Sequence, residues 1–522
     1  MSTLAESVER RLDEAARRAE TLVPGPALDM VGRVESIGDD VAMVSGLPQA
    51  RLNELLLFER EGGGQPATAM VLALDPGLIG CAMLGVGEGI GAGSRVRGTG
   101  SVASVPVGRM LLGRVVNPLG IPLDGGPELA VKSFEPVEKP APGIVDRDLV
   151  SQALQTGLTV IDAMLALGRG QRELIIGDRE TGKTAIAVDT IINQRDSGVV
   201  CVYCAVGQKM SSVTQVIEAV RSYGAPERCI FVIAASDDPP GLQWLAPYAA
   251  CTMAEYFSER GGDALLVIDD LTSHAVIYRQ LSLLLRNPPG REAYPGDIFY
   301  IHSRLLERAA KLNHERGGGS LTALPIAATE EGNISAYIPT NLISITDGQI
   351  VLDPRLFHVG QKPAVNIGRS VSRVGGKTQA PAMQKLAEKL RLVYAQFLEL
   401  EIFTRFGGMV DDRTRRVIEH GRRIRAVLTQ PQFSGLAMPH QVALLLALDE
   451  RMLDPLPLER VTEFRNSLAQ WLAEKGAAPV ERIRSTGILD DTARAALLRL
   501  MAEHIAHLGG SAAGAAAGPR AK

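Results

Sequence analysis

The sequence predicts a multidomain fold with an N-terminal β-barrel, a central parallel α/β domain and a C-terminal helical bundle. Three successive patterns predict it. Short apolar or alternating runs between Gly, Asp and Pro fill residues 27–95, short apolar strands alternate with helical patterns over 96–379, and apolar residues recur every third or fourth position over 380–508. An amphipathic helix over 1–26 and a disordered Gly/Ala-rich tail over 509–522 complete the expected organisation.

The composition of the chain excludes several classes of protein. Its 522 residues are 46% hydrophobic and 22% charged, which is typical of globular domains and not of disordered or fibrous proteins. A net charge of −4 and only 4% aromatic residues disfavour nucleic-acid binding, which usually needs basic and stacking side chains. No apolar run is long enough to span a membrane, so we expect any membrane role to come through partners.

The five cysteines are too few and too scattered for a disulfide framework, and they fit a reducing compartment. Cys201 and Cys204 form a CxxC pair, but no second pair or histidine cluster completes a metal site. The pair lies in the apolar run Val199–Val206. We therefore interpret it as two buried strand cysteines.

The first segment of the chain has the pattern of a short amphipathic helix. Apolar residues recur at steps of three or four from Leu4 to Leu22, and Pro24-Gly25-Pro26 ends the pattern. Such a helix either packs on its own domain or docks on a partner. The strands expected next are separated by turn signals such as Gly38-Asp39-Asp40 and Glu61–Gly64.

The central domain carries a phosphate-binding motif in the context that it requires. A short strand, Glu173–Ile176, precedes the pattern G-x-x-x-x-G-K-T, and a helical run, Ala185–Gln194, follows it. Backbone N–H groups of such a loop, and the start of the helix, surround a phosphate chain with positive potential. The expected nucleotide-binding residues are Gly177, Asp178, Arg179, Glu180, Thr181, Gly182, Lys183 and Thr184. Gly375–Thr378 resembles a second such loop, but Val371 stands where its first glycine is needed.

Two residues of this domain are expected to serve a magnesium ion. The Thr184 hydroxyl is placed to hold Mg²⁺, and Lys183 to reach the terminal phosphates. Asp269 ends the apolar run Ala264–Ile268, where a neighbouring buried strand supplies the acid that orients the water shell of the metal. The sequence thus predicts binding of Mg²⁺ with ATP or ADP, with Asp269 acting through water.

Further motifs resemble the alpha subunits of rotary F-type ATP synthases, from about Val31 to Ala506. Beside the loop described above, they are Asn287–Asp297, His302–Ala310, Ile338–Asn341, Ser344–Gln349 and Pro363–Gly375. The resemblance implies a β-barrel crown, a RecA-like nucleotide-binding domain and a helical C-terminal domain. This plan agrees with the three patterns read from the residues.

The resemblance also implies an assembly and its location. Copies of this chain would alternate with beta subunits in a hexamer around a gamma shaft, and the N-terminal helix would help to dock the delta and b subunits of a peripheral stalk. The whole assembly would make ATP from ADP and phosphate, driven by H⁺ or Na⁺ flow, and would run in reverse as hydrolysis. It would lie peripherally on the cytoplasmic face of a bacterial inner membrane, touching the membrane only through the ion-translocating sector.

Gln208 distinguishes this chain from the catalytic beta subunit of the family that it resembles. The beta subunit carries a glutamate that activates the attacking water, whereas the matching stretch here is Ala205–Lys209. A glutamine can orient water but cannot take its proton at neutral pH. The resemblance therefore implies a bound nucleotide that is not turned over, although glutamine does position water in some P-loop enzymes.

Two further assignments come from the resemblance. Arg373, in the stretch Ser370–Arg373, matches the arginine finger that is inserted into the active site of a neighbouring beta subunit. A planar, permanently charged guanidinium suits a phosphoryl group on which charge develops. The adenine pocket of this subunit maps onto Phe357, Gln430 and Gln432, although a core phenylalanine and loop glutamines would explain the same residues.

The chain departs from the family pattern at a few positions. Glu180 stands where glutamine is usual and Lys362 where arginine is usual, and the stretch Gly375–Thr378 is atypical. These departures suggest a divergent branch, such as an alternate or N-type synthase that moves Na⁺.

Two alternative functions belong to other classes of protein. A self-sufficient secretion-type ATPase would carry its own glutamate at the position of Gln208. A Rho-type RNA-translocating hexamer would carry a more basic and aromatic N-terminal module. Neither fits Gln208 together with the stretch Ser370–Arg373.

Overall fold

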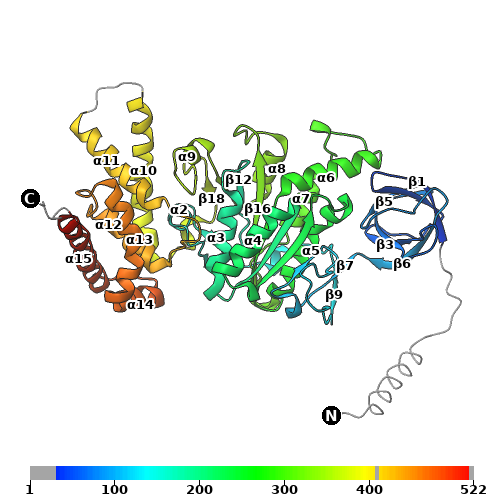
Figure 1. The fold of residues 1–522 in the computed structure, drawn as a ribbon, viewed down its shortest axis with the longest axis horizontal. Coiled ribbons are helices and arrows are strands. Elements are labelled where there is room, and N and C mark those ends of the chain that lie inside the picture. The colour runs from blue at the N-terminus through cyan, green and yellow to red at the C-terminus, as the bar shows by residue number, and fades with distance from the viewer. Residues whose placement is uncertain (1–30, 406–410, 516–522) are drawn as a thin grey trace, which may run out of the picture.

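The computed structural model describes residues 31–405 and 411–515, in which three domains follow one another along an elongated molecule (Figure 1). The helix expected over residues 1–26 and the end of the expected tail, 516–522, lie outside these residues.

The first domain is a closed six-stranded barrel with the strand order β1-β2-β5-β4-β3-β6. Its core is a cluster of alternating inward residues that includes Val34, Leu56, Phe58 and Met83. The strands are β1 (Val31–Gly38), β2 (Val41–Ser45), β3 (Glu54–Phe58), β4 (Ala67–Asp75), β5 (Leu78–Met83) and β6 (Arg95–Val102).

The barrel runs on to Val102, past residue 95, where the sequence predicted its end. The closing strand, β6, was missed because Val96 is its one buried residue and two glycines interrupt it. Without an apolar alternation, nothing in its pattern marks it as a strand. It closes the barrel by pairing with both β1 and β3.

The central domain is built on an eight-stranded sheet in the order β18-β17-β12-β16-β15-β13-β14-β8. All its pairs are parallel except the one between β17 and the edge strand β18. The strands are β8 (Val115–Val116), β12 (Leu174–Asp178), β13 (Val200–Gln208), β14 (Cys229–Ala235), β15 (Asp263–Asp269), β16 (Ser320–Thr329), β17 (Gly348–Val351) and β18 (Val371–Ser372). There are also two small two-stranded antiparallel sheets, formed by β7 (Ser104–Pro106) with β9 (Phe134–Pro136) and by β10 (Ala153–Leu154) with β11 (Leu167–Gly168).

Helices cover both faces of this sheet, because its buried strands are apolar on both sides. Along β13, Cys201 and Tyr203 face one core, and Val202 and Cys204 face the other. The first core continues into α2 (Thr159–Met164), α3 (Lys183–Asn193), α4 (Met210–Tyr223) and the C-terminal domain. The second includes α5 (Pro240–Ser258), α6 (Leu271–Leu284), α7 (Ile298–Leu306) and α8 (Tyr337–Ile345); a short helix, α9 (Pro354–His358), follows β17.

Cys201 and Cys204 are free and buried, as predicted. Within the described residues there is also no cluster of three or more His, Cys, Asp or Glu that could hold a metal. The two side chains pack on opposite faces of the sheet.

The third domain is a bundle of helices that packs against the central domain through α10 and α2. It comprises α10 (Pro381–Arg405), α11 (Asp412–Leu428), α12 (Met438–Asp449), α13 (Leu458–Lys475), α14 (Ala477–Thr486) and α15 (Asp491–Ala515). The last helix continues beyond residue 508, where the sequence analysis placed the start of a disordered tail. Alanine is the best helix former, so the alanines of this stretch favour continuation of the helix.

Candidate functional site

The phosphate-loop motif forms the turn between β12 and α3. Gly182 has φ 94°, which glycine adopts without strain, and it directly precedes Lys183, the first residue of α3. A Cβ on Gly177 would lie 2.9 Å from the Cβ of Leu352 and 3.0 Å from its carbonyl oxygen, so the close approach of β17 requires glycine there. The backbone N–H groups of residues 179–182 donate to no acceptor in the described part of the chain. They are therefore available to an anion at the N-terminus of the helix.

Side chains hold the loop in this conformation. The Asp178 carboxylate accepts hydrogen bonds from Thr329 Oγ1 at 2.5 Å and from the Gly332 N–H at 2.8 Å. Lys183 is 8% exposed, and its Nζ donates to the Asp178 carbonyl at 2.5 Å. Burial lowers the pKa of Lys183, while the charges of Asp270, Asp269 and Asp178 oppose that shift. The ammonium group thus lies inside the loop that would wrap a phosphate chain.

The side chains of Thr184 and Asp269 meet beside the loop. Thr184 Oγ1 donates to Asp269 Oδ2 at 2.7 Å, and the hydroxyl of Tyr203 donates to the same oxygen at 2.9 Å. Burial, and then the charge of Asp270, raises the pKa of Asp269 to about 6. A hydroxyl and a carboxylate side by side are hard oxygen donors that fit a small divalent cation, whose remaining ligands are usually water and phosphate.

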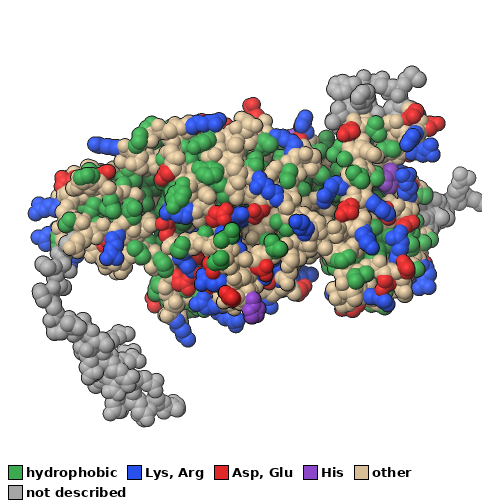
Figure 2. Space-filling model, turned by 180° about the vertical axis from the view of Figure 1, so that it is seen from behind, with side chains coloured by type: hydrophobic (Ala, Val, Ile, Leu, Met, Phe, Trp, Pro, Cys, Tyr) green, Lys and Arg blue, Asp and Glu red, His purple; other side chains and the backbone are tan. Residues whose placement is uncertain are grey.

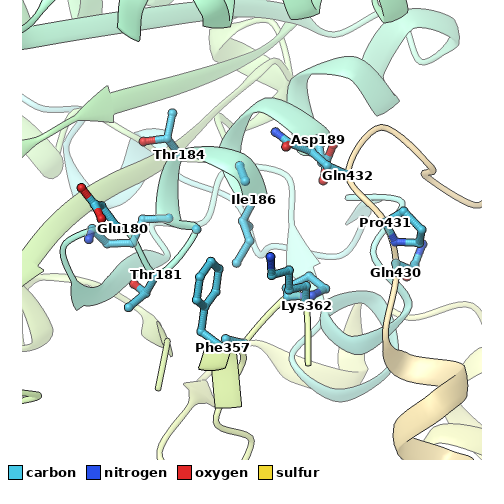
Figure 3. A pocket seen from close by; sticks show the side chains of 15 residues that line it. Glu180, Thr181, Thr184, Ile186, Asp189, Phe357, Lys362, Gln430, Pro431 and Gln432 are labelled. Carbon is cyan, nitrogen blue, oxygen red and sulfur yellow. The ribbon is translucent and has the colours of Figure 1, made fainter. Parts of the chain in front are cut away.

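A cavity of about 410 Å³ opens beside the loop (Figure 3). It brings together three parts of the chain that the sequence analysis linked only by resemblance: the loop and the start of α3, the segment after β17, and the start of the C-terminal domain. Lys362 Nζ lies 4.5 Å from the centre of the Phe357 ring, a cation–π contact. The lining residues are Glu180, Thr181, Gly182, Lys183, Thr184, Ala185, Ile186, Asp189, Phe357, Lys362, Pro363, Ala364, Gln430, Pro431 and Gln432.

The two glutamines of the expected adenine pocket differ in what their side chains can do. Gln430 is 3% exposed, and its amide is used within the chain: it accepts from the Thr159 N–H at 2.6 Å and donates to the Gly157 and Ser434 carbonyls at 3.0 and 3.1 Å. Gln432 is exposed at the cavity and has no hydrogen-bond partner in the described chain. Gln430 therefore fixes the wall of the cavity, and Gln432 is the amide that remains available to a ligand.

Sequence reasoning missed two polar residues of this region. Asp189, on α3, lines the cavity and accepts a hydrogen bond from the Phe433 N–H at 2.9 Å, and burial raises its pKa to about 6. It lies seven residues, two helical turns, after Gly182, and this spacing was the signal that could have revealed it. Tyr203 donates to Asp269 from a strand that is remote in sequence, and no local pattern marks that contact.

The structure does not bring Gln208 and Arg373 into the cavity. Gln208 ends β13, where its carbonyl accepts from the Ser236 N–H at 3.0 Å. Arg373 directly follows the edge strand β18, and its backbone N–H donates to the Asp347 carbonyl at 2.9 Å. Its guanidinium is exposed, with no hydrogen bond or ion pair among residues 31–405 and 411–515.

On the face that Figure 2 presents, Lys and Arg side chains are interspersed with Asp and Glu rather than gathered in one basic patch. Among the described helices none has the length and hydropathy of a membrane span.

Comparison with known proteins agrees with this architecture. Residues 157–372 match the model of the ATP synthase alpha/beta family, nucleotide-binding domain, and residues 379–504 match that of the ATP synthase alpha/beta chain, C terminal domain. The chain is 57% identical over 475 residues to ATP synthase subunit alpha 3 of Paraburkholderia xenovorans (strain LB400), covering 91% of this chain and 89% of that protein. It is 56% identical over 483 residues to ATP synthase subunit alpha 2 of Burkholderia thailandensis, covering 92% and 84%. The chain therefore belongs to the ATP synthase alpha/beta family and, within it, to the alpha subunits.

Proposed function

We propose that this chain is the non-catalytic alpha subunit of its ATP synthase, holding a nucleotide in its own cavity and lending Arg373 to the catalytic site of a neighbouring beta subunit. One observation carries the proposal: the Arg373 guanidinium is exposed and unpaired within the described chain, and it lies outside the cavity of its own subunit. An arginine supplied across an interface stabilises the charge of the phosphoryl group in the transition state.

Gln208 accounts for the silence of the chain's own site. An amide has no proton-accepting capacity near neutral pH, so it can orient a water but cannot activate it as a carboxylate would. The bound nucleotide would then serve regulation or stability of the assembly.

In the nucleotide site, the N–H groups of residues 179–182 and Lys183 would bind the phosphates, and Phe357 and Gln432 would receive the adenine. Thr184 would ligate Mg²⁺ directly, and Asp269 would act through water. The cation, when bound, neutralises charge on the phosphates. Asp178, Thr329 and Gly332 keep the loop open for them.

The partners and the location follow the same proposal. The chain would alternate with beta subunits around a gamma shaft and would bind the delta and b subunits of the stalk through residues 2–22. It would lie on the cytoplasmic face of the inner membrane and couple ATP synthesis or hydrolysis to H⁺ or Na⁺ transport through other subunits. Deletion of residues 2–22 is expected to impair coupled pumping more than ATP hydrolysis by the soluble assembly.

The test is steady-state Mg-ATP hydrolysis by the purified chain without nucleic acid, compared with the chain assembled with its beta subunits. We expect measurable ATP binding without turnover by the chain alone, and turnover after assembly. Vigorous turnover by the chain alone, abolished by Lys183→Ala, would contradict the proposal and favour a self-assembling motor.

A further inference from the structure

A buried carboxyl group lies beneath β18, the short strand that directly precedes Arg373. Glu173, which precedes β12, is 0% exposed, and its N–H donates to the Ala323 carbonyl at 3.0 Å. A Cβ on Gly348 would lie 2.6 Å from Glu173 Oε2 and 2.9 Å from Oε1. The carboxyl group therefore packs against the backbone at the start of β17, directly opposite Ser372 of β18 in the strand register.

Gln171 joins this carboxyl group to β18. Its side-chain Nε2 donates to Glu173 Oε2 at 2.7 Å and to Ser372 Oγ at 3.2 Å, while its Oε1 accepts from the Gly168 N–H at 2.8 Å. Ser372 Oγ in turn donates to the Ala166 carbonyl at 3.0 Å and accepts from the Gly375 N–H at 3.1 Å. The network thus fixes Ser372, the residue before Arg373, and Gly375, the second residue after it.

One oxygen of this network, Glu173 Oε1, is buried and has no hydrogen-bond partner in the described chain. A buried carboxylate oxygen without a donor is unfavourable, so a nearby cation has a strong effect on it. Burial, followed by the charge of Asp347, raises the pKa of Glu173 well above its ordinary value, whereas the Gln171 hydrogen bond and the charge of Arg373 lower it.

Asp347 fixes the backbone of Arg373 and leaves its guanidinium unpaired. The Asp347 carbonyl accepts from the Arg373 N–H at 2.9 Å. Its carboxylate is already paired, because it accepts from Arg172 Nε at 3.0 Å and from Arg172 Nη2 at 2.8 Å. The guanidinium of Arg373 has no such partner within the described residues.

We propose that Glu173 is a positioning residue for Arg373, acting from beneath the sheet edge with Gln171 as its link to Ser372. This inference rests on the proposed function of Arg373 in a neighbouring site. A long, exposed arginine samples many rotamers, and ordering it costs conformational entropy. The hydrogen bonds that join Glu173, Gln171 and Ser372 fix the backbone at the base of Arg373 before the phosphoryl group arrives. Such preorganisation increases a rate.

The test is a double-mutant cycle on the assembled enzyme, with the chain carrying Glu173→Ala, Arg373→Ala or both. Glu173→Ala removes the acceptor of the Gln171 hydrogen bond, whereas Glu173→Gln keeps an oxygen for it. We expect Glu173→Ala to lower kcat for Mg-ATP hydrolysis about tenfold, with KM within about twofold, and to have no further effect in the Arg373→Ala background. Glu173→Gln should retain most of the turnover. Glu54→Ala, a change at a buried glutamate in the barrel, is the matched control and is expected to leave kcat unchanged.

The outcomes separate this inference from the one on which it rests. Full turnover by Arg373→Ala would overturn the proposed finger. Loss of turnover by Arg373→Ala, with an equal effect of Glu173→Ala in both backgrounds or none in the wild-type background, would overturn only the role of Glu173. If turnover by Arg373→Ala is too slow to measure, affinity for Mg-ADP with fluoroaluminate, a mimic of the transferring phosphoryl group, supplies the same cycle. Thermal unfolding of each chain checks that the variants fold.

Discussion

The phosphate-loop cavity and the β18 edge lie on the same sheet, yet they differ in how much of their chemistry is completed within one chain. In the cavity, Lys183 and Thr184 have partners on neighbouring strands and loops, and an aromatic ring and an amide face the same space. At the edge, Arg373 extends from a fixed backbone without a partner for its guanidinium in the described chain. The first region is built to hold a ligand by itself, and the second becomes useful only when another molecule lies against it.

The largest effect is expected from Arg373→Ala. If the edge acts only in trans, turnover of the assembled enzyme should fall by about 10³–10⁵, while the chain's own affinity for Mg-ATP stays unchanged. Single-turnover hydrolysis and equilibrium nucleotide binding measure the two quantities. Arg369→Ala, which removes a second exposed arginine from the same segment, is the control and should have little effect on turnover. A parallel loss of nucleotide binding by Arg373→Ala would contradict the separation of the two regions.

Lys183→Ala tests the cavity, and the expected pattern is the reverse of that for Arg373→Ala: nucleotide binding weakens while turnover remains. Removal of a buried ammonium from the loop should weaken Mg-ATP binding by this chain about 10–100-fold, because charged hydrogen bonds to phosphate are lost. Turnover of the assembly should largely remain. The control is Lys377→Ala, in the sequence that resembles a second phosphate loop but forms a short turn after β18. Loss of all turnover in a properly assembled Lys183→Ala enzyme would mean that the cavity is itself catalytic.

The cavity was the more predictable of the two regions. Residues 177–184 and Asp269 form local patterns, because a glycine-rich turn and an acid at a strand end are visible in a short stretch of sequence. The contact between Gln171 and Ser372 joins residues about 200 positions apart, and no periodicity encodes it. Gln430 shows the same limit: its presence beside the cavity was expected, but its amide is occupied by the backbone around Gly157 and Thr159.

The fold was predicted for a similar reason, and the missed strand β6 shows which kind of element a sequence pattern does not reveal. Domains with regular apolar spacing were found with the correct architecture. The polar strand β6 is specified by its hydrogen bonds to β1 and β3 rather than by its own side chains. Elements that depend on partners distant in the sequence are therefore visible only in the structure.

A third prediction concerns Asp189, the buried acid of the cavity wall. Burial raises its pKa from 3.8 to about 6, so the folded chain prefers its neutral form. That preference contributes stability below pH 3.8 and is lost as the pH rises to about 6. Asp189→Asn keeps an acceptor for the Phe433 N–H and removes the charge. We expect the variant to be more stable at pH 8 by about 2 kcal/mol, after allowance for partial contact with water, and the difference to vanish near pH 4.

Denaturant unfolding of the two chains at both pH values, followed through Trp244 in the central domain, measures this difference. Asp196→Asn, which removes a charge from an exposed side chain, is the control. An equal stability difference at pH 4 and pH 8 would mean that Asp189 does not titrate in this range. Burial would then not control the charge of this part of the cavity wall.

The smallest effect is expected from Glu180→Gln, a change within the cavity. Glu180 lies in the loop at φ 62°, is exposed and lines the cavity. Its charge repels the phosphates of a nucleotide, but water screens an exposed group, so Glu180→Gln should tighten Mg-ATP binding by only about two- to fivefold. The gain should shrink in high salt, because the interaction is a screened charge repulsion. Glu331→Gln, another exposed glutamate at positive φ but outside the cavity, is the control. Weaker binding by Glu180→Gln would show that the carboxylate assists the ligand, through a cation or a water, rather than opposing it.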